Sequence, residues 1–198
     1  PMKNQRSLNS LISVGFGVVT AFAIGLASNT AHAAAEGQHA LWVGGAGGVL
    51  VPNKSSTTAR GAFGITGGAK LGTEWALGAY YFTSKKDEGG VLGKFDLDFY
   101  GVEGSYHFEG EAKGAYFGAR VGITKVDFGI AAITASASPA HFGVFGGYNH
   151  WVTDSVSIGG DVGFYSVSKG DATAASGVAL SVDSFSALSF LATVKFWL

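Results

Sequence analysis

The 198-residue chain has no cysteine, 13 basic and 14 acidic residues, and abundant glycine (32) and aromatic residues (13%). The absence of cysteine excludes a disulfide scaffold and a thiolate metal site, and without a basic tract nothing points to a nucleic-acid partner. Glycine together with aromatic side chains is typical of β-strands rather than of disorder, so we expect an all-β protein.

The chain begins with the layout of a secretory signal peptide. Lys3 and Arg6 precede an apolar run over residues 11–26, and the small-residue motif Ala31–Ala33 follows it. The run is short for the roughly 20 residues of a membrane helix and is interrupted by glycines, which disfavours an anchor. We therefore expect a signal peptide, residues 1–33, cleaved after Ala33, and one mature domain, residues 34–198.

Beyond the leader, no apolar run reaches the length of a membrane helix, so a membrane-resident chain would have to span with strands. Alternating patterns predict eight strands, at 41–51, 60–71, 74–83, 94–108, 114–128, 140–151, 155–168 and 178–198. Long connections are expected at 52–59, 84–93, 129–139 and 169–177, and short ones between them. This rhythm predicts an eight-stranded antiparallel transmembrane up-and-down β-barrel with long outer loops and short periplasmic turns.

Within these strands, apolar residues alternate with small polar ones. Phe63 and Ile65 in the second strand, and Val162 and Phe164 in the seventh, are expected to face lipid. The inner face should be rich in glycine, because an eight-stranded barrel is only wide enough for side chains to fill it. The orientation of strand 140–151 stays open, since a two-residue and a three-residue connection to the next strand turn opposite sides outward.

The hairpin of the fourth and fifth strands has the best-defined register. With Glu111 and Ala112 as its turn pair, Glu103 lies directly across from Arg120 inside the barrel. The lipid-facing pairs of this register are Tyr106 with Phe117, Gly104 with Ala119, Val102 with Val121 and Tyr100 with Ile123.

Six inward charges form a predicted lumen ionic network. They are Lys70, Glu103, Arg120, Asp161, Asp183 and Lys195. Because both signs are equally represented, the network suits a plugged core, whereas a selective pore would favour one sign.

Toward the outer end of the same hairpin, the polarity of both strands reverses. The residues predicted to point outward are Lys94, Asp96, Asp98, Lys125 and Asp127, and those predicted to point inward are Phe95, Leu97, Phe99, Val126 and Phe128. A β-bulge in each strand is one explanation. A simpler one is that both strands leave the membrane at the same height, so that the inward set becomes a candidate apolar ligand site in the upper lumen.

The last strand keeps its alternation to the final residue. Phe190, Val194, Phe196 and Leu198 lie on one lipid-compatible face. They resemble the C-terminal assembly signal of bacterial outer-membrane barrels, where an aromatic residue usually comes last; here Leu198 is last and Trp197 precedes it. An amphipathic edge strand of a soluble sandwich is the alternative interpretation.

These features together resemble the small outer-membrane barrels grouped around OmpA, OmpX and OmpW. The resemblance rests on pattern over the whole mature chain, not on a distinctive motif. It implies an integral, monomeric protein of a Gram-negative outer membrane. Such a barrel would contact outer-membrane lipid and lipopolysaccharide, be inserted by the barrel assembly machinery, and act through its loops or lumen.

Two functions fit this architecture. The first is a structural or surface-interaction barrel whose lumen is plugged by the ionic network. The second is an OmpW-like, porin-like conduit or binding protein for small hydrophobic molecules. The balanced charges favour the first, and the apolar upper lumen and the apolar connection at 129–139 favour the second.

Catalytic and cofactor chemistry finds little support. The glycine run 44–48 lacks the lysine and hydroxyl residue of a nucleotide loop. His141, His150 and Asp154 are too scattered for a metal site. His107 has no partner serine that the sequence can place, so a nucleophilic enzyme is disfavoured. We therefore expect no enzyme activity, no cofactor and no metal.

Overall fold

The computed structural model describes residues 40–53, 59–87, 94–130, 133–174 and 179–198. The expected signal peptide and its cleavage site lie outside these ranges. Within them, no helix is long and apolar enough to cross a membrane.

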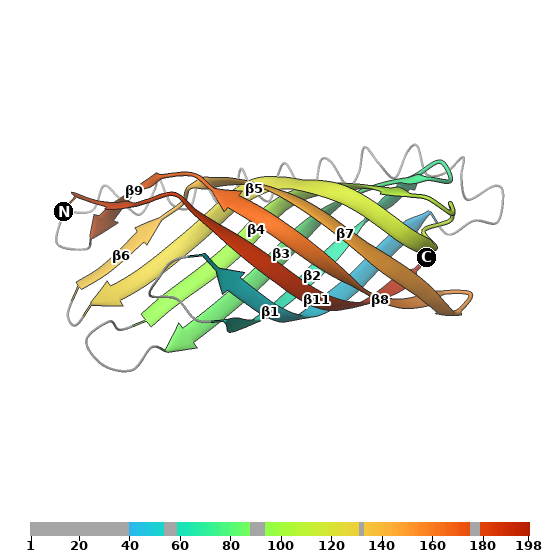
Figure 1. Ribbon diagram of the computed structural model, residues 1–198, viewed down its shortest axis with the longest axis horizontal. Coiled ribbons are helices and arrows are strands. Elements are labelled where there is room, and N and C mark those ends of the chain that lie inside the picture. The colour runs from blue at the N-terminus through green and yellow to red at the C-terminus, as the bar shows by residue number, and fades with distance from the viewer. Residues whose placement is uncertain (1–39, 54–58, 88–93, 131–132, 175–178) are drawn as a thin grey trace.

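The described residues form one antiparallel sheet that curls into an elongated barrel with obliquely running strands (Figure 1). The strands are β1 (Leu41–Pro52), β2 (Arg60–Leu71), β3 (Trp75–Asp87), β4 (Lys94–His107), β5 (Gly114–Ile130), β6 (Ile133–Ala137), β7 (Ala140–Thr153), β8 (Val156–Val167), β9 (Gly170–Ala174), β10 (Ala179–Val182) and β11 (Phe185–Trp197). The ring closes because β1 pairs with β11 and β5 pairs with β7. The ring consists of eight strands, namely β1 to β5, β7, β8 and β11. This confirms the predicted eight-stranded barrel.

The predictions of loops at 129–139 and 169–177 were wrong, because both regions contain strands. β6 continues the line of β7 and pairs with the outer end of β5, while β9 pairs with both β6 and β10. Figure 1 shows β6 and β9 beyond one end of the ring. Alanines from β6 and β9 pack together there, with Leu180 and Val182 of β10 against them. Short runs of small residues therefore extend the sheet, although their composition resembles that of a loop.

Large apolar side chains are exposed on the outer face of every strand of the ring. Examples, with their exposed fractions, are Val43 (51%), Phe63 (67%), Trp75 (54%), Tyr100 (42%), Phe117 (53%), Phe142 (52%), Val162 (50%) and Phe196 (52%). Soluble monomers rarely expose apolar patches of more than a few hundred Å². A continuous apolar band around a closed ring is instead the outer surface of a barrel that faces lipid.

The orientation of β7, which the sequence left open, is now defined. Phe142 and Val144 are exposed on the outer face, whereas His141 and Phe145 are buried inside. A register shift between Trp151 and Thr153 marks a bulge before the turn to β8. The turn itself has two residues, 154 and 155, and the bulge adds one more residue to β7. The rest of β7 therefore has the register expected for a three-residue connection.

The β4–β5 hairpin adopts the predicted register without interruption, from His107 opposite Tyr116 to Phe95 opposite Phe128. Glu111 and Ala112 both have positive φ angles, 49° and 56°. The Lys113 amide donates to the Gly110 carbonyl at 3.0 Å, which closes the turn. Positive φ at both central residues is the type I′ geometry that suits the twist of a hairpin. No bulge lies between these pairs, so bulges do not cause the reversal of polarity at the outer end.

Candidate functional site in the barrel lumen

Arg120 on β5 lies at the centre of a buried polar cluster, which we call the Arg120 network. Its Nε donates to Glu103 Oε2 at 2.8 Å and its Nη2 to Asp161 Oδ2 at 3.2 Å. Its Nη1 donates to the Tyr165 hydroxyl at 2.7 Å, and Thr66 Oγ1 donates to Glu103 Oε1 at 2.6 Å. The network therefore links β2, β4, β5 and β8 across the lumen. Charge-assisted bonds of this kind are the stronger class of hydrogen bond.

Aromatic rings surround the same guanidinium. Its carbon lies 3.9 Å from the centre of the Phe145 ring, 5.0 Å from Phe82 and 5.5 Å from Tyr80. These rings come from β3, which lies between β2 and β4, and from β7, which lies between β5 and β8. A desolvated guanidinium over aromatic faces gains cation–π stabilisation in addition to its hydrogen bonds. Polar and aromatic contacts together fill the middle of the barrel.

The structure brings five of the six predicted network residues into the lumen. Lys70 and Lys195 are 7% and 9% exposed, and Lys195 Nζ lies about 5 Å from the rings of Trp42 and Tyr116. The prediction for Asp183 was wrong, since its side chain is exposed. Asp183 lies in the break between β10 and β11, where the strand alternation is interrupted. Of the predicted set, three cations and two anions therefore lie in the lumen, and Arg60 of β2, which the sequence analysis did not include, is also buried.

A histidine that the sequence set aside also belongs to the lumen. His141 Nδ1 lies 2.9 Å from Thr124 Oγ1, and its Nε2 is hydrogen-bonded to the Tyr80 hydroxyl. The Phe99 and Tyr165 rings both pack edge-on against it, at 5.3 and 6.0 Å. Its neighbours are therefore hydroxyls and rings. The described residues contain no group of three side chains suited to a metal ion.

The inward apolar residues near the outer end form a packed cluster, the upper apolar cluster. Its buried members are Leu50, Ala62, Tyr80, Phe82, Leu97, Phe99, Val126, Tyr165, Val167, Phe185, Ala187 and Leu191. Leu97 and Val126 have no exposed surface, and Phe99 is 3% exposed. For Phe95 and Phe128 the structure describes the backbone pairing but not the side chains. Leu97, Phe99 and Val126 of the predicted apolar set thus pack in one cluster with residues of β8 and β11.

The outward residues at the same height are polar, as the reversal of polarity requires. Lys125 Nζ pairs with Asp127 Oδ2 at 2.5 Å, and the Tyr81 hydroxyl donates to Asp98 Oδ1 at 3.1 Å. The hydrogen bond that Lys125 donates to the Asp127 carboxylate raises the pKa of Lys125. Burial favours a raised pKa for Asp127, but hydrogen bonds from Lys125 and Ser136 hold it below its usual value. An outer face that carries paired charges is typical of strand segments that extend out of the membrane into water.

Three tryptophans fill the periplasmic end, a feature that the sequence analysis missed. Trp197 stacks on Trp151 at 5.3 Å and lies 6.1 Å from Trp42, with Ala112 of the turn packed against them. Trp197 Nε1 donates to Ser157 Oγ at 2.9 Å. We call these residues the tryptophan cap. Strand alternation places Trp42 and Trp197 inward, so their position could have been found from the sequence, whereas that of Trp151 depends on the bulge in β7.

Between the Arg120 network and the tryptophan cap lies a small polar space of about 10 Å³. Lys195, Thr193, Asp161 and His107 line it. That volume holds about one water molecule. Ser105 Oγ lies 3.2 Å from His107 Nε2, so the histidine does have a serine neighbour, contrary to the sequence analysis. His107 is only 2% exposed, and the pair lies behind the tryptophan cap.

The predicted assembly residues lie on the outer face of β11 and at the chain end. Phe190, Val194, Phe196 and Leu198 are 49%, 42%, 52% and 70% exposed. The Leu198 amide donates to the Leu41 carbonyl at 2.8 Å, so the final residue still pairs with β1. The alternation predicted to the end of the chain is therefore present in the structure.

Comparison with solved structures finds barrels of the same kind. The chain is similar to neisserial surface protein A (TM-score 0.64, 16% identity, 80% of this chain and 97% of that one). It is also similar to the N-terminal β-barrel domain of OprF from Pseudomonas aeruginosa (0.54, 12%, 80% and 97%). A third is Ail, the attachment invasion locus protein of Yersinia pestis (0.50, 10%, 79% and 95%). No protein-family model and no curated protein matches the chain. At these identities the similarity shows the fold alone, that of small outer-membrane β-barrels.

Proposed function

We propose that the protein is an integral bacterial outer-membrane barrel with a structural or surface-interaction role, without pore or enzyme activity. The observation that carries this proposal is the position of Arg120. Its guanidinium reaches from β5 to Asp161 and Tyr165 on β8 and is enclosed by aromatic rings. An ion moving along the lumen would have to break these buried contacts, and removing one partner of a buried ion pair costs roughly 3–5 kcal/mol.

The packing above and below Arg120 supports the same proposal. The upper apolar cluster fills the lumen toward the outer end, and the tryptophan cap fills it toward the periplasmic end. A polar pore needs a wet path, whereas these two levels are apolar. A plugged barrel can act through its outer surface, where the extension formed by β6, β9 and β10 stands beyond the ring (Figure 1).

The proposed partners follow from this placement. The apolar band contacts outer-membrane lipid, and the charged outer ends of β4 and β5 lie at the level of lipopolysaccharide headgroups. The exposed alternating face of β11 suits recognition by the barrel assembly machinery during insertion. The barrel closes on itself through β1 and β11, so it needs no second copy to complete its sheet, and we propose a monomer.

A conduit for small hydrophobic molecules is the second candidate. The observation that favours it is the apolar lining of the upper lumen, including Leu97, Phe99 and Val126. In this structure the same side chains are packed together, so a guest would have to displace protein atoms. Transport would therefore require the upper apolar cluster to open.

Flux of a hydrophobic solute into lipid vesicles distinguishes the two functions. Vesicles containing the wild-type barrel should take up the solute no faster than empty vesicles. The variant Leu97→Asn/Val126→Asn should lose several kcal/mol of stability, because it buries unsatisfied amides. The matched control is Asp98→Asn/Lys125→Asn, which changes the outward neighbours on the same strands. Faster uptake with wild type and control, lost in the first variant, would establish the conduit instead.

A further inference from the structure

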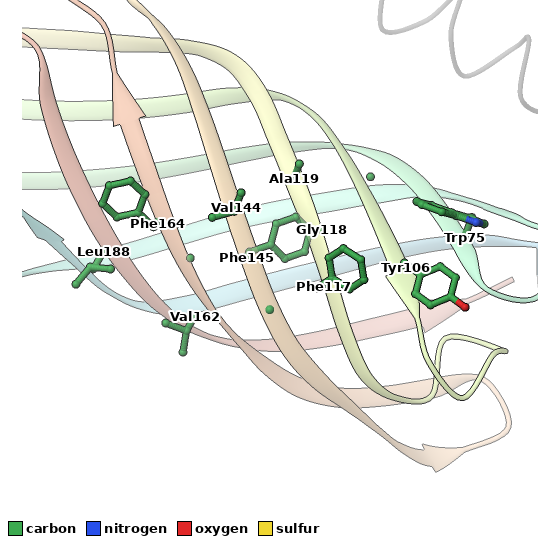
Figure 2. Close-up of a pocket in the computed structure, with 13 residues that line it drawn as sticks. Trp75, Tyr106, Phe117, Gly118, Ala119, Val144, Phe145, Val162, Phe164 and Leu188 are labelled. Carbon is green, nitrogen blue, oxygen red and sulfur yellow. The ribbon is translucent and has the colours of Figure 1, made fainter.

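The lipid-facing surface carries a groove that none of the features described so far explains. It has a volume of about 620 Å³ and crosses the outer face from β3 and β4 over β5 and β7 to β8 and β11. Figure 2 shows Trp75, Tyr106 and Phe117 near one end and Val162, Phe164 and Leu188 toward the other. We call this hollow the outer groove. Its volume lies within the roughly 300–1,000 Å³ typical of ligand pockets.

The floor of the outer groove is made of small residues on three neighbouring strands. Gly104 lies on β4, Ala119 pairs with it on β5, and Gly146 follows on β7. A Cβ atom added to Gly104 would lie 3.7 Å from Leu77, and one added to Gly146 would lie 3.5 Å from the Tyr116 carbonyl oxygen. Both are ordinary van der Waals distances. Larger side chains would therefore fit the protein itself, and would fill the groove.

The glycines that face inward behind this surface behave differently. A Cβ at Gly118 would collide with the Phe145 ring and the Gly104 carbonyl, and one at Gly163 would lie 2.7 Å from Ser189 Oγ. Internal packing therefore requires glycine on the inner face of these strands. It does not require glycine at Gly104 or Gly146. Gly118, Gly163 and Phe145 also line the hollow, but only its outward glycines can be replaced without a clash inside the barrel.

The surroundings of the outer groove define its occupant. The groove lies within the apolar band, where the medium is lipid hydrocarbon. Its lower end is at the periplasmic boundary: Trp75 begins β3 directly after the turn, and Tyr106 is hydrogen-bonded to Glu74 in that turn. The rings of Trp75 and Tyr106 meet edge-on at 5.1 Å, and such aromatic pairs are typical of the headgroup level. The groove thus runs from that level into the hydrocarbon.

We propose that the outer groove binds one acyl chain of a glycerophospholipid from the periplasmic leaflet, with its headgroup beside Trp75 and Tyr106. A flexible, unbranched chain fits an open apolar groove that starts at an interface. A second copy of the barrel fits less well, because a two-fold contact would bring the same hollow face to face and leave it empty. Lipid A is anchored in the opposite leaflet, far from the aromatic end.

Retention of lipid through purification tests this proposal. The groove variant is Gly104→Leu/Gly146→Leu, which fills the floor. The matched control is Gly45→Leu on the outer face of β1, where an added Cβ would have no neighbour closer than 4.0 Å. Circular dichroism and heat-modifiable gel mobility establish that each variant folds. Native mass spectrometry in mild detergent should find one phospholipid per barrel for the wild type and the control, and loss of that lipid for the groove variant.

Equal retention by all three proteins would overturn the proposal, as would a retained lipid A or a dimer that the groove variant dissociates. A second measurement does not depend on detergent. A phosphatidylethanolamine with a photoreactive group midway along one chain is placed in nanodiscs with the wild-type barrel. Crosslinks should concentrate on peptides containing Phe117 and Val144. An even distribution around the barrel would contradict specific binding.

Discussion

The Arg120 network and the upper apolar cluster lie next to each other on the same strands, and both are almost completely buried. They hold the lumen together by different means. Arg120 has directional bonds to Glu103, Asp161 and Tyr165. Leu97 and Val126 have only packing contacts. A substitution in the Arg120 network should therefore lower stability according to which buried charge loses its partner. A substitution in the upper apolar cluster should lower stability according to the side-chain volume that it removes.

The largest effect should come from removing the central charge. Arg120→Met leaves Glu103 and Asp161 buried without their cation, and should lower the free energy of unfolding by roughly 3–5 kcal/mol. The double variant Glu103→Gln/Arg120→Met should lose less than the sum of the single losses, by about 1 kcal/mol or more. Urea unfolding in detergent measures the cycle. Strictly additive losses would mean that the two side chains do not interact.

A slightly smaller loss is expected in the upper apolar cluster. Leu97→Ala removes buried volume without leaving a charge, and should cost roughly 2–4 kcal/mol. Combining it with Glu103→Gln should give additive losses if the two levels are independent. The same unfolding assay measures both variants. Strong coupling between them would show that the two levels form one unit.

A moderate effect is expected on the lipid face of β11. Phe196→Asp places a charge near the end of the last strand, where the depth-dependent cost of an acidic residue is at most about 1 kcal/mol. Insertion should also fall, because the alternating face of β11 is interrupted. The yield of folded barrel in outer-membrane fractions measures this. A Ser189→Ala control keeps the alternation, and normal insertion of both variants would refute the assembly role.

The smallest effect is expected at the outer surface. Lys125→Ala removes a pair whose side chains are 45% and 37% exposed, so the loss should stay within about 0.5 kcal/mol. The lowered pKa of Asp127 means that the pair stabilises the fold above the unfolded pKa, and that this contribution is lost as the pH falls through the folded value. Unfolding at pH 7 and pH 3 should therefore differ slightly less in the variant than in the wild type. A larger difference in the variant would contradict this assignment.

Strand alternation predicted most of the fold because its period of two applies to every residue of a closed sheet. It gave the pairing of Glu103 with Arg120 and the inward position of Leu97 and Val126. It failed at Asp183, because the break between β10 and β11 resets the period. It could not orient β7, because the deciding bulge at Val152 depends on local turn geometry.

The contents of the lumen were predictable only in part. Alternation says which residues face inward, but it does not say which of them meet across the barrel. Tyr165 bonds to Arg120 from two strands away, and His141 bonds to Tyr80 from three strands away. Such contacts depend on the barrel's closure and tilt, which no local pattern encodes. The tryptophan cap was missed for the same reason.

The most direct test of the plugged lumen is a planar-bilayer recording of the purified barrel. Wild-type protein should add no steady ionic conductance, because the Arg120 network, the upper apolar cluster and the tryptophan cap fill the lumen. Arg120→Ala should give at most rare, brief openings, since the levels above and below it remain closed. A stable ohmic conductance from the wild-type barrel, unchanged in Trp197→Ala and Arg120→Ala, would contradict the account.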